Sequence, residues 1–518
     1  MIGFVNLQFL LGSFVACATA LVSAADAAGP VVVSFSGGSN PGVILAMFEA
    51  AAMKRIDGAW DRVKVVGSNS GGTQFATQLF WGPQMWNDFL SPQDADMTAS
   101  FEAYADQYNE TYILKGWINQ EEGYEQPLME FELPPNMTEE CIDVELWASY
   151  FLQPSSLGIM NDQPTRTPNW GWGATGTTVP LGTMVTDDFS NTDLSGTTFV
   201  ATTSLLPDRL DEDGLTWVVA VTDDGGAVVP PGCISPHGFS VSAKDGPKWL
   251  SPSGLQGYSL STTSSDSDEI TPLPPPQDMT VNELQGCSGH AFENFLSSPT
   301  IMKAMTSFVP DGGLAENTGM AFALAQLQAD YDYDESSTAT LLLFNNIEGD
   351  SFVEALFTAV NETEITGISP FCYPKPTLFI DAYPTDDFQN YTNTMVEWNN
   401  TMYEHFAQYW QGEVTTVDNP FYGVTGGQKL KLLIILNFTP QVPNVNPAEA
   451  GLYATAESEM QMVADTKHVY AQIAQDMTGA TEQLLRANVF TTASSDQASE
   501  DGFNGVAPNE DSLDDPQP

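Results

Sequence analysis

The first residue that could take part in a reaction is a serine between an apolar run and a glycine pair. Ser70 follows the β-branched segment 62–66 and precedes Gly71 and Gly72. Small neighbours allow a sharp turn that projects a hydroxyl from the carboxyl end of a strand, as a nucleophilic serine requires. Backbone N–H groups at the start of the following helix would point at developing negative charge. A plain glycine-rich turn is the alternative interpretation.

A second glycine-rich loop, Ser36–Gly42, also lies between an expected strand and an expected helix. Glycines at Gly37 and Gly38 let backbone N–H groups approach an oxyanion or a phosphate. Because an acyl hydrolase needs both a nucleophile and an oxyanion hole, this loop strengthens the interpretation of Ser70.

An acidic residue in a third turn could supply a base. Asp311 precedes a Gly-Gly pair and follows an expected strand, so its carboxylate could take the proton of Ser70. A second Asp-Gly-Gly, at 224–226, lies between two apolar runs, and we interpret it as a hairpin turn. Ser288, in Gly-Cys-Ser-Gly, resembles a nucleophile turn, but polar Pro-rich sequence precedes it in place of a strand.

These three elements, in this order, resemble the patatin and cytosolic phospholipase A2/lysophospholipase B superfamily. Its members carry a glycine-rich oxyanion loop, a Gly-x-Ser-x-Gly turn and a later Asp-Gly-Gly, and they use a Ser–Asp dyad without a catalytic histidine. The resemblance implies that Ser70 is the nucleophile and Asp311 the base. It further implies an oxyanion hole formed by Gly37, Gly38 and Gly71.

Other positions refine the resemblance. Asn317 matches a family asparagine that follows Asp-Gly-Gly and would have a supporting role. Ser39-Asn40-Pro41 replaces the family's Gly-x-Arg, and Ser68 replaces the first glycine of the serine turn. Because the missing arginine is a natural partner for phosphate, we expect a neutral or zwitterionic lipid ester as substrate.

The alternation of strands and helices predicts a parallel sheet with helices on its faces. Strands are expected at 31–35, 62–66, 305–309, 339–344, 377–380 and 429–436, and helices at 42–56, 71–80, 315–327, 392–411 and 457–485. We therefore expect a three-layer α/β/α sandwich over residues 28–490. Pro, Gly and polar stretches at 85–300 indicate an inserted cap.

The charge excludes several classes of partner. Fifteen Lys and Arg residues against 67 Asp and Glu residues give a net charge of −52. Such a surface repels nucleic acids and anionic bilayers, so we expect no nucleic-acid partner and at most transient contact with a membrane surface. No cysteine pair has zinc-ligand spacing, and no cofactor or metal is expected.

Several features favour export. Residues 1–24 are uncharged and end in a small-x-small site, which predicts a signal peptide, with a buried first helix as the alternative. Four cysteines then remain and could form disulfides in three pairings or stay as free thiols: Cys141, Cys233, Cys287 and Cys372. Glycosylation sequons begin at Asn109, Asn136, Asn361, Asn390, Asn399 and Asn437. Residues 491–518 are expected to form a disordered acidic tail.

We thus expect a protein secreted, or held in an endomembrane or vacuolar lumen, that hydrolyses lipid esters through a covalent acyl-enzyme. The activity would resemble that of a phospholipase or lysophospholipase. An acyltransferase on the same dyad and a catalytically inactive lipid-binding glycoprotein are the alternatives.

Overall fold

The computed structural model describes most of the expected core of this 518-residue chain. The described residues are 29–90, 96–108, 183–205, 235–250, 312–347, 349–359, 365–369, 373–438 and 456–490, with short stretches at 179, 259–260, 271–272, 277, 279–281, 284–285 and 288.

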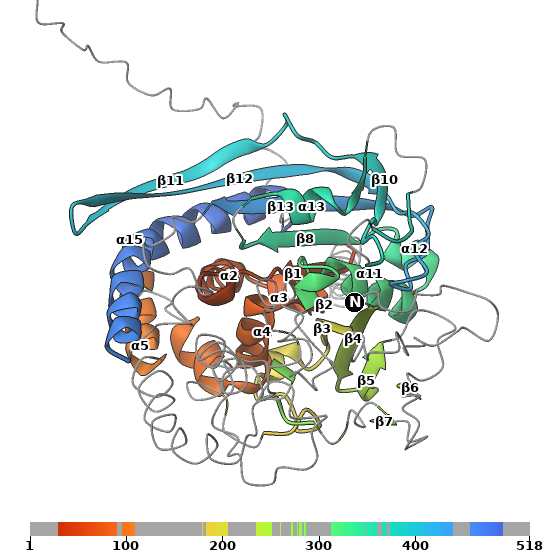
Figure 1. Ribbon diagram of the computed structural model, residues 1–518, viewed down its shortest axis with the longest axis horizontal. Coiled ribbons are helices and arrows are strands. Elements are labelled where there is room, and N and C mark those ends of the chain that lie inside the picture. Colours follow the sequence, from red (N-terminus) through yellow and green to blue (C-terminus); the bar gives the residue numbers. More distant parts are fainter. Residues whose placement is uncertain are drawn as a thin grey trace, which may run out of the picture.

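A nine-stranded sheet runs through the centre of the molecule (Figure 1), in the order β11-β12-β13-β8-β1-β2-β3-β4-β5. The middle five strands, from β13 to β3, are parallel, and two antiparallel strands extend each side. The strands are β1 Val31–Phe35, β2 Val63–Ser68, β3 Thr198–Leu205, β4 Ser235–Ser242, β5 Gly246–Leu250, β8 Thr340–Asn345, β11 Gln389–Trp398, β12 Thr401–Thr415 and β13 Lys429–Phe438. The expected mixed α/β architecture with a mostly parallel sheet is therefore confirmed.

The central strands are covered on both faces. Every residue of β1 and β8 is buried, which explains their continuous apolar sequences. Val31, Val33 and Phe35 join one hydrophobic cluster, whereas Val32 joins another. This alternation places one apolar core on each side of the sheet.

Four helices lie on one side of the sheet, and one helix of 11 residues lies on the other. The first face carries α2 Ser39–Lys54, α4 Gly71–Trp81, α5 Met97–Tyr108 and α15 Ala456–Asn488, and the second carries α11 Met320–Asp330. The shorter helical elements are α3 Ala59–Arg62, α12 Tyr333–Ser336, α13 Ser351–Glu354, the π-helix η1 Met85–Phe89 and the 3₁₀ helices η6 Thr192–Leu194 and η8 Gly312–Leu314. Two short strand pairs complete the described elements: β9 Phe357–Thr358 with β10 Phe379–Ala382, and β6 Ser259–Leu260 with β7 Thr271–Pro272.

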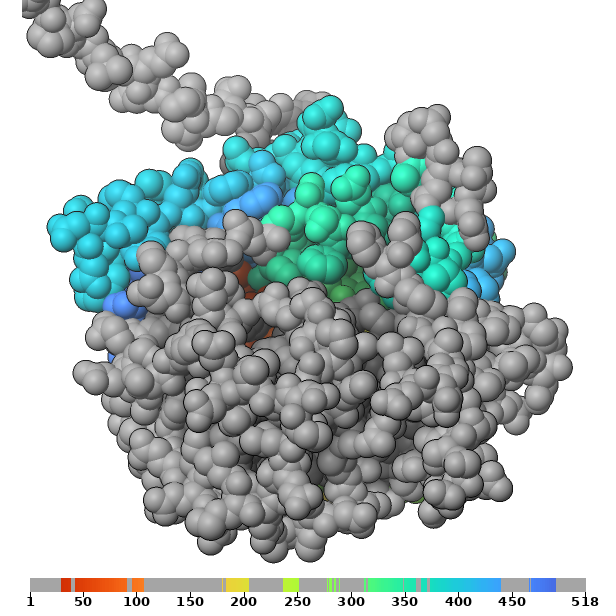
Figure 2. All heavy atoms as spheres, viewed as in Figure 1, coloured from red at the N-terminus to blue at the C-terminus, as the bar shows by residue number. Residues whose placement is uncertain are grey.

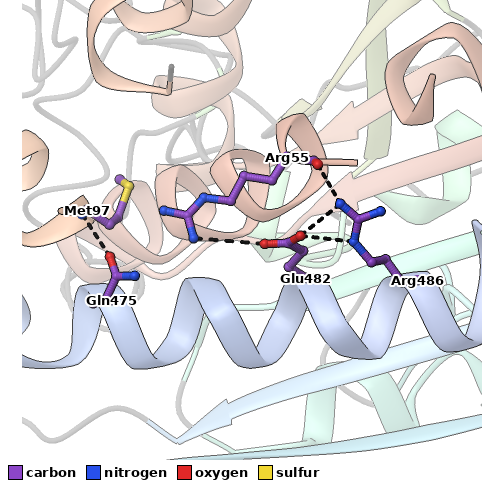
Figure 3. Close-up of polar contacts among 5 residues, drawn as sticks. All are labelled: Arg55, Met97, Gln475, Glu482 and Arg486. Atoms are coloured by element: carbon purple, nitrogen blue, oxygen red, sulfur yellow. Dashed lines mark hydrogen bonds and ion pairs between the residues drawn. The ribbon is translucent and has the colours of Figure 1, made fainter. Parts of the chain in front are cut away.

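The C-terminal helix α15 is tied to the N-terminal helices by polar contacts (Figure 3). Glu482 of α15 lies 3.9 Å from the guanidinium of Arg55, at the end of α2, and 2.9 Å from that of Arg486. Arg486 also donates to the carbonyl oxygen of Arg55, at 2.7 Å. Two turns earlier in α15, the side chain of Gln475 accepts from the backbone N–H of Met97, the first residue of α5.

Two expectations about the fold are wrong. The segment 392–411 is not a helix but most of the β11–β12 hairpin, because its side chains alternate between exposed and buried, as at Met402, Tyr403 and Glu404. Asn399 and Asn400 form the turn with φ of 50° and 60°, a conformation that asparagine tolerates. The hairpin forms one edge of the molecule (Figures 1 and 2).

The second wrong expectation concerns part of the cap expected at 85–300. β3 pairs in parallel with β2, and β4 and β5 follow it, so these strands extend the central sheet. The other residues of 85–300 lie largely outside the described part.

The other expected strands and helices that fall on described residues are confirmed in type, with shifts at their ends. The strands at 31–35, 62–66, 339–344 and 429–436 are β1, β2, β8 and β13, and the strand at 377–380 is β10. The helices at 42–56, 71–80, 315–327 and 457–485 are α2, α4, α11 and α15. The strand at 305–309, the segments 1–24 and 491–518, and the four cysteines lie outside the described residues. Within the described part, no helix has the length and apolarity to span a bilayer.

A buried histidine makes the stability of the fold dependent on pH. His405 of β12 lies opposite Thr394, and burial lowers its pKa to about 4 from its usual value of 6.5. The unfolded chain therefore binds a proton between these two pH values that the folded chain does not. We expect the free energy of unfolding to fall, as pH drops from 6.5 to 4, by about 2 kcal/mol more in the wild type than in His405→Leu. Urea titrations across this window measure the difference, with Tyr403→Phe as a neutral packing control, and parallel slopes in wild type and variant would contradict it.

Candidate active site

The parallel strands bring the expected chemical groups to one edge of the sheet. β1, β2 and β3 follow one another in one direction, whereas β8 and β13 lie on the other side of β1. Ligands of such sheets bind beyond the carboxyl ends of the strands at the position where the order reverses. Here that position lies between β1 and β8, where the chain continues into the loops at 36–38 and 346.

Ser70 lies in the turn between β2 and α4 with a strained backbone. Its φ is 47° and its ψ is −121°, and the side chain is 8% exposed. The other described non-glycine residues with positive φ are the hairpin residues Asn399 and Asn400. A serine in this region costs about 1–3 kcal/mol, and such strain gathers at functional sites. The turn therefore has the conformation expected for a nucleophile.

The turn is possible because the backbone segments around it approach very closely. A Cβ atom on Gly72 would lie 2.2 Å from the carbonyl oxygen of Phe35, at the end of β1. A Cβ atom on Gly319 would lie 2.8 Å from the backbone of Ser68. Ser68, which replaces a glycine of the family pattern, is buried, and its hydroxyl donates to the carbonyl oxygen of Val200 at 3.0 Å. The serine at position 68 is thus accommodated by hydrogen bonds of its hydroxyl, which also accepts from the hydroxyl of Thr73 at 3.0 Å.

The loop before α11 is brought against the serine turn. The Asn69 side chain donates to Oδ1 of Asn317 at 2.5 Å, and a Cβ atom on Gly312 would lie 2.4 Å from Oδ1 of Asn69. Asn317 therefore reaches the site as expected. Asp311 lies outside the described residues, but its covalent neighbour Gly312 packs against the residue that precedes Ser70.

The expected oxyanion donors need one correction. The N–H of Gly37 donates to the carbonyl oxygen of Asn317 at 3.0 Å, so it is not available to a substrate. Within the described part of the chain, the N–H groups of Gly38 and Gly71 have no hydrogen-bond acceptor. Gly38 has a φ of 139°, and a Cβ atom there would lie 2.3 Å from the carbonyl oxygen of Asn346. These two N–H groups, one at the start of α2 and one at the start of α4, remain as donors.

Ser288 is a residue of the site whose role the sequence did not reveal. Its carbonyl oxygen accepts from the N–H of Ser70 at 3.1 Å, and its hydroxyl donates to the carbonyl oxygen of Thr202 at 2.8 Å. Thr73 of α4 lies 2.7 Å from the same hydroxyl. Ser288 therefore connects the serine turn to β3. Its Gly-Cys-Ser-Gly surroundings suggested a rival nucleophile, but its hydroxyl is buried and engaged.

Two buried carboxylates lie near the loops of the site. Glu316 accepts from the N–H groups of Thr318, at 2.6 Å, and Ala321, at 3.3 Å, at the start of α11. Burial raises its pKa above the usual value, although these hydrogen bonds act in the opposite direction. Glu49 of α2 is buried as well, and burial raises its pKa well above the usual value. Glu316 shapes the loop that contains Asn317.

The described histidines occupy packing positions. His237 stacks on Trp249 and His468 on Trp398, while His405 is buried in β12. Burial lowers the pKa of His237 to about 3. Among the described residues, no three His, Cys, Asp or Glu side chains gather in a way that could hold a metal ion. The groups that the structure brings together at Ser70 are hydroxyls, amides and backbone N–H groups.

The expected glycosylation sites differ in the exposure of their asparagines. Asn390 and Asn399 are exposed on the β11–β12 hairpin, whereas Asn109, Asn136 and Asn361 lie outside the described residues. Asn437 is 1% exposed, and its amide nitrogen donates to Glu49 and Asn346 at 2.7 Å each. A glycan would replace one of the two hydrogens on this nitrogen and so break one of the two bonds, and the buried site has no solvent-exposed side for a sugar, so the structure argues against the expected glycosylation of Asn437.

Neither a family model nor a curated protein matches this sequence. The functional interpretation therefore depends on the geometry of the site and on its motifs.

The strain at Ser70 can be measured without any substrate. Because glycine adopts a φ of 47° freely whereas alanine does not, we expect Ser70→Gly to unfold with a free energy about 1 kcal/mol higher than Ser70→Ala. Urea denaturation of the two purified variants gives this difference.

The matched control is Ser204, a buried serine in the regular strand β3. There the order should be reversed, with Ser204→Gly about 0.5–1 kcal/mol less stable than Ser204→Ala. If Ser70→Gly were also the less stable of its pair, the turn would not be strained.

Proposed function

We propose that this protein is a serine acyl hydrolase that cleaves a carboxylic ester of a lipid through a covalent acyl-enzyme. The observation that carries the proposal is the strained conformation of Ser70 between a parallel strand and a helix. Plain glycine-rich turns place glycine at the residue of positive φ, because serine there costs free energy. Here glycines occupy the surrounding positions instead, and the serine has the strained conformation.

The proposed reaction begins when Oγ of Ser70 attacks the ester carbonyl carbon and its proton passes to the carboxylate of Asp311. The N–H groups of Gly38 and Gly71 donate to the oxyanion of the tetrahedral intermediate. The intermediate collapses, and the leaving alcohol takes the proton from Asp311. Water then attacks the acyl-enzyme with Asp311 again as base, which releases the fatty acid and restores Ser70.

The order of the motifs supports membership of the patatin and cytosolic phospholipase A2/lysophospholipase B superfamily as part of the proposal. The chain carries its glycine loop after β1, its serine turn after β2 and its Asp-Gly-Gly before α11. The contacts of Gly312 and Asn317 with Asn69 support a Ser70–Asp311 dyad, because they bring the third motif against the serine turn.

Charge and sequence support the substrate class and the compartment that we propose. A net charge of −52 disfavours an anionic lipid, and no arginine follows Gly38 to bind a phosphate. A neutral or zwitterionic ester is therefore proposed. The uncharged N-terminal segment and the exposed sequons at Asn390 and Asn399 support a secreted or lumenal glycoprotein.

The test is covalent labelling of the purified mature protein with a fluorophosphonate probe, followed by peptide mass mapping. We expect one adduct on Ser70, none in Ser70→Ala, and a labelling rate at least about 100-fold lower in Asp311→Asn. Asp224→Asn is the matched control, because it changes the other Asp-Gly-Gly and should leave the rate unchanged.

The outcomes separate the rival functions. Absence of an adduct on folded wild-type protein would overturn the hydrolase proposal and favour a lipid-binding protein without catalysis. An adduct on Ser70, with transfer of the acyl group to an added alcohol in preference to water, would indicate an acyltransferase.

A further inference from the structure

A buried carboxylate lies behind the oxyanion loop. Glu49 of α2 is fully buried, and its two oxygens accept from Nδ2 of Asn346 at 2.9 Å and from Nδ2 of Asn437 at 2.7 Å. Asn437 also donates to Oδ1 of Asn346 at 2.7 Å. The three side chains therefore join α2 to the carboxyl ends of β8 and β13.

This cluster is costly for the fold. Removing a carboxylate from water costs several kcal/mol even when it is hydrogen-bonded, and a well-packed apolar side chain is often equally stabilising. The same core contains apolar helix residues next to Glu49, such as Phe48 and Ala50. Stability alone thus gives no reason for a carboxylate at this position.

Asn346 connects the cluster to the oxyanion loop by two contacts. Its N–H donates to Oγ of Ser36 at 2.7 Å. A Cβ atom on Gly38 would lie 2.3 Å from the carbonyl oxygen of Asn346, so the loop backbone packs directly on this oxygen. The position of Asn346 consequently determines the position of the loop.

Ser36 extends the connection to the peptide bond between Gly37 and Gly38. Its hydroxyl donates to the carbonyl oxygen of Gly37 at 3.0 Å. A trans peptide is planar, so the N–H of Gly38 points opposite to that carbonyl group. Holding the oxygen of Gly37 therefore fixes the direction of the Gly38 N–H, one of the two backbone donors that remain for the oxyanion.

We propose that Glu49 is a positioning residue, which orients the Gly38 N–H toward the substrate oxyanion through Asn346 and Ser36. The inference depends on the proposed function, because it gives this N–H a role in the reaction. Without the connection, the Gly37–Gly38 peptide can rotate, and the donor no longer meets the oxyanion. Substrate binding before reaction does not need this donor, so the effect falls on kcat.

The test measures kcat and KM for a soluble p-nitrophenyl ester. Glu49→Leu and Ser36→Ala should lower kcat about 10- to 100-fold and leave KM within about twofold, since loss of an oxyanion donor acts on the transition state. Glu49→Gln keeps the size of the side chain and one of the two acceptor oxygens, so its kcat should lie between that of Glu49→Leu and that of the wild type.

The matched control is Gln428→Leu. Gln428 is buried and donates to Ser336 at 2.8 Å, at the opposite end of β13 from Asn437. Its replacement also leaves buried polar partners without a hydrogen bond, and kcat should be unchanged whatever the change in melting temperature. Fluorophosphonate labelling of Ser70 is followed in every variant.

Two results would overturn the inference separately from the function. If Ser70→Ala abolishes turnover while folded Ser36→Ala and folded Glu49→Gln and Glu49→Leu all keep kcat within twofold, the carboxylate is structural only. A fall in kcat for Gln428→Leu equal to that for Glu49→Leu would likewise attribute the loss to stability. Failure of wild-type protein to label at all overturns the proposed function and this inference with it.

Discussion

The close approach of backbone segments at the carboxyl edge of the sheet is the constraint on which the site depends. The serine turn lies against the end of β1 on one side and against the loop before α11 on the other. Neither contact leaves room for a Cβ atom at Gly72 or Gly319. The absence of these two side chains thus allows the turn after β2 to contain a serine with a strained backbone. The buried apolar strands on both sides hold the turn in this conformation.

The polar groups that hold the loops are mostly neutral. Amides at Asn69, Asn317 and Asn346 and the hydroxyls of Ser36 and Ser288 make the contacts between segments far apart in the chain. In a protein with so few basic residues, charges have few opposite partners to compensate their burial. Amides and hydroxyls avoid most of that cost, and each can donate and accept at once. The loops are therefore connected without a salt bridge in the described part of the site.

Local patterns could predict the elements of this fold but not the contacts between them. Val31–Phe35 and Thr340–Asn345 are recognisable because strands covered on both faces are continuously apolar. The hairpin at 389–415 was not recognised because its alternation is obscured by polar residues on its inward face, such as the half-buried Thr394 and the buried His405. The placement of β3 beside β2 could not be foreseen, because it depends on packing between distant segments.

The same distinction applies to the site. Ser70, Gly38 and Gly71 could be selected from their neighbours, since turn geometry is a local property. The engagement of the Gly37 N–H by Asn317 is a contact across 280 positions, and it appears only in the folded chain. Ser288 was noticed for its surroundings but assigned no part, because it acts as an acceptor: its carbonyl oxygen and its hydroxyl oxygen both lie within hydrogen-bond distance of the N–H of Ser70, across 218 positions.

The position of β1 in the middle of the sheet has a consequence for how the chain is synthesised. β1 is among the first described residues to be made, yet its second neighbour, β8, begins only at Thr340. The cover of α2 by α15 comes later still, with contacts such as that between Arg55 and Glu482. Throughout translation of the intervening segment, one edge of β1 and one face of α2 lack the partners that they have in the folded protein. The described part of the fold is therefore completed only after α15 has been made, and aggregation through these apolar surfaces competes with folding until then.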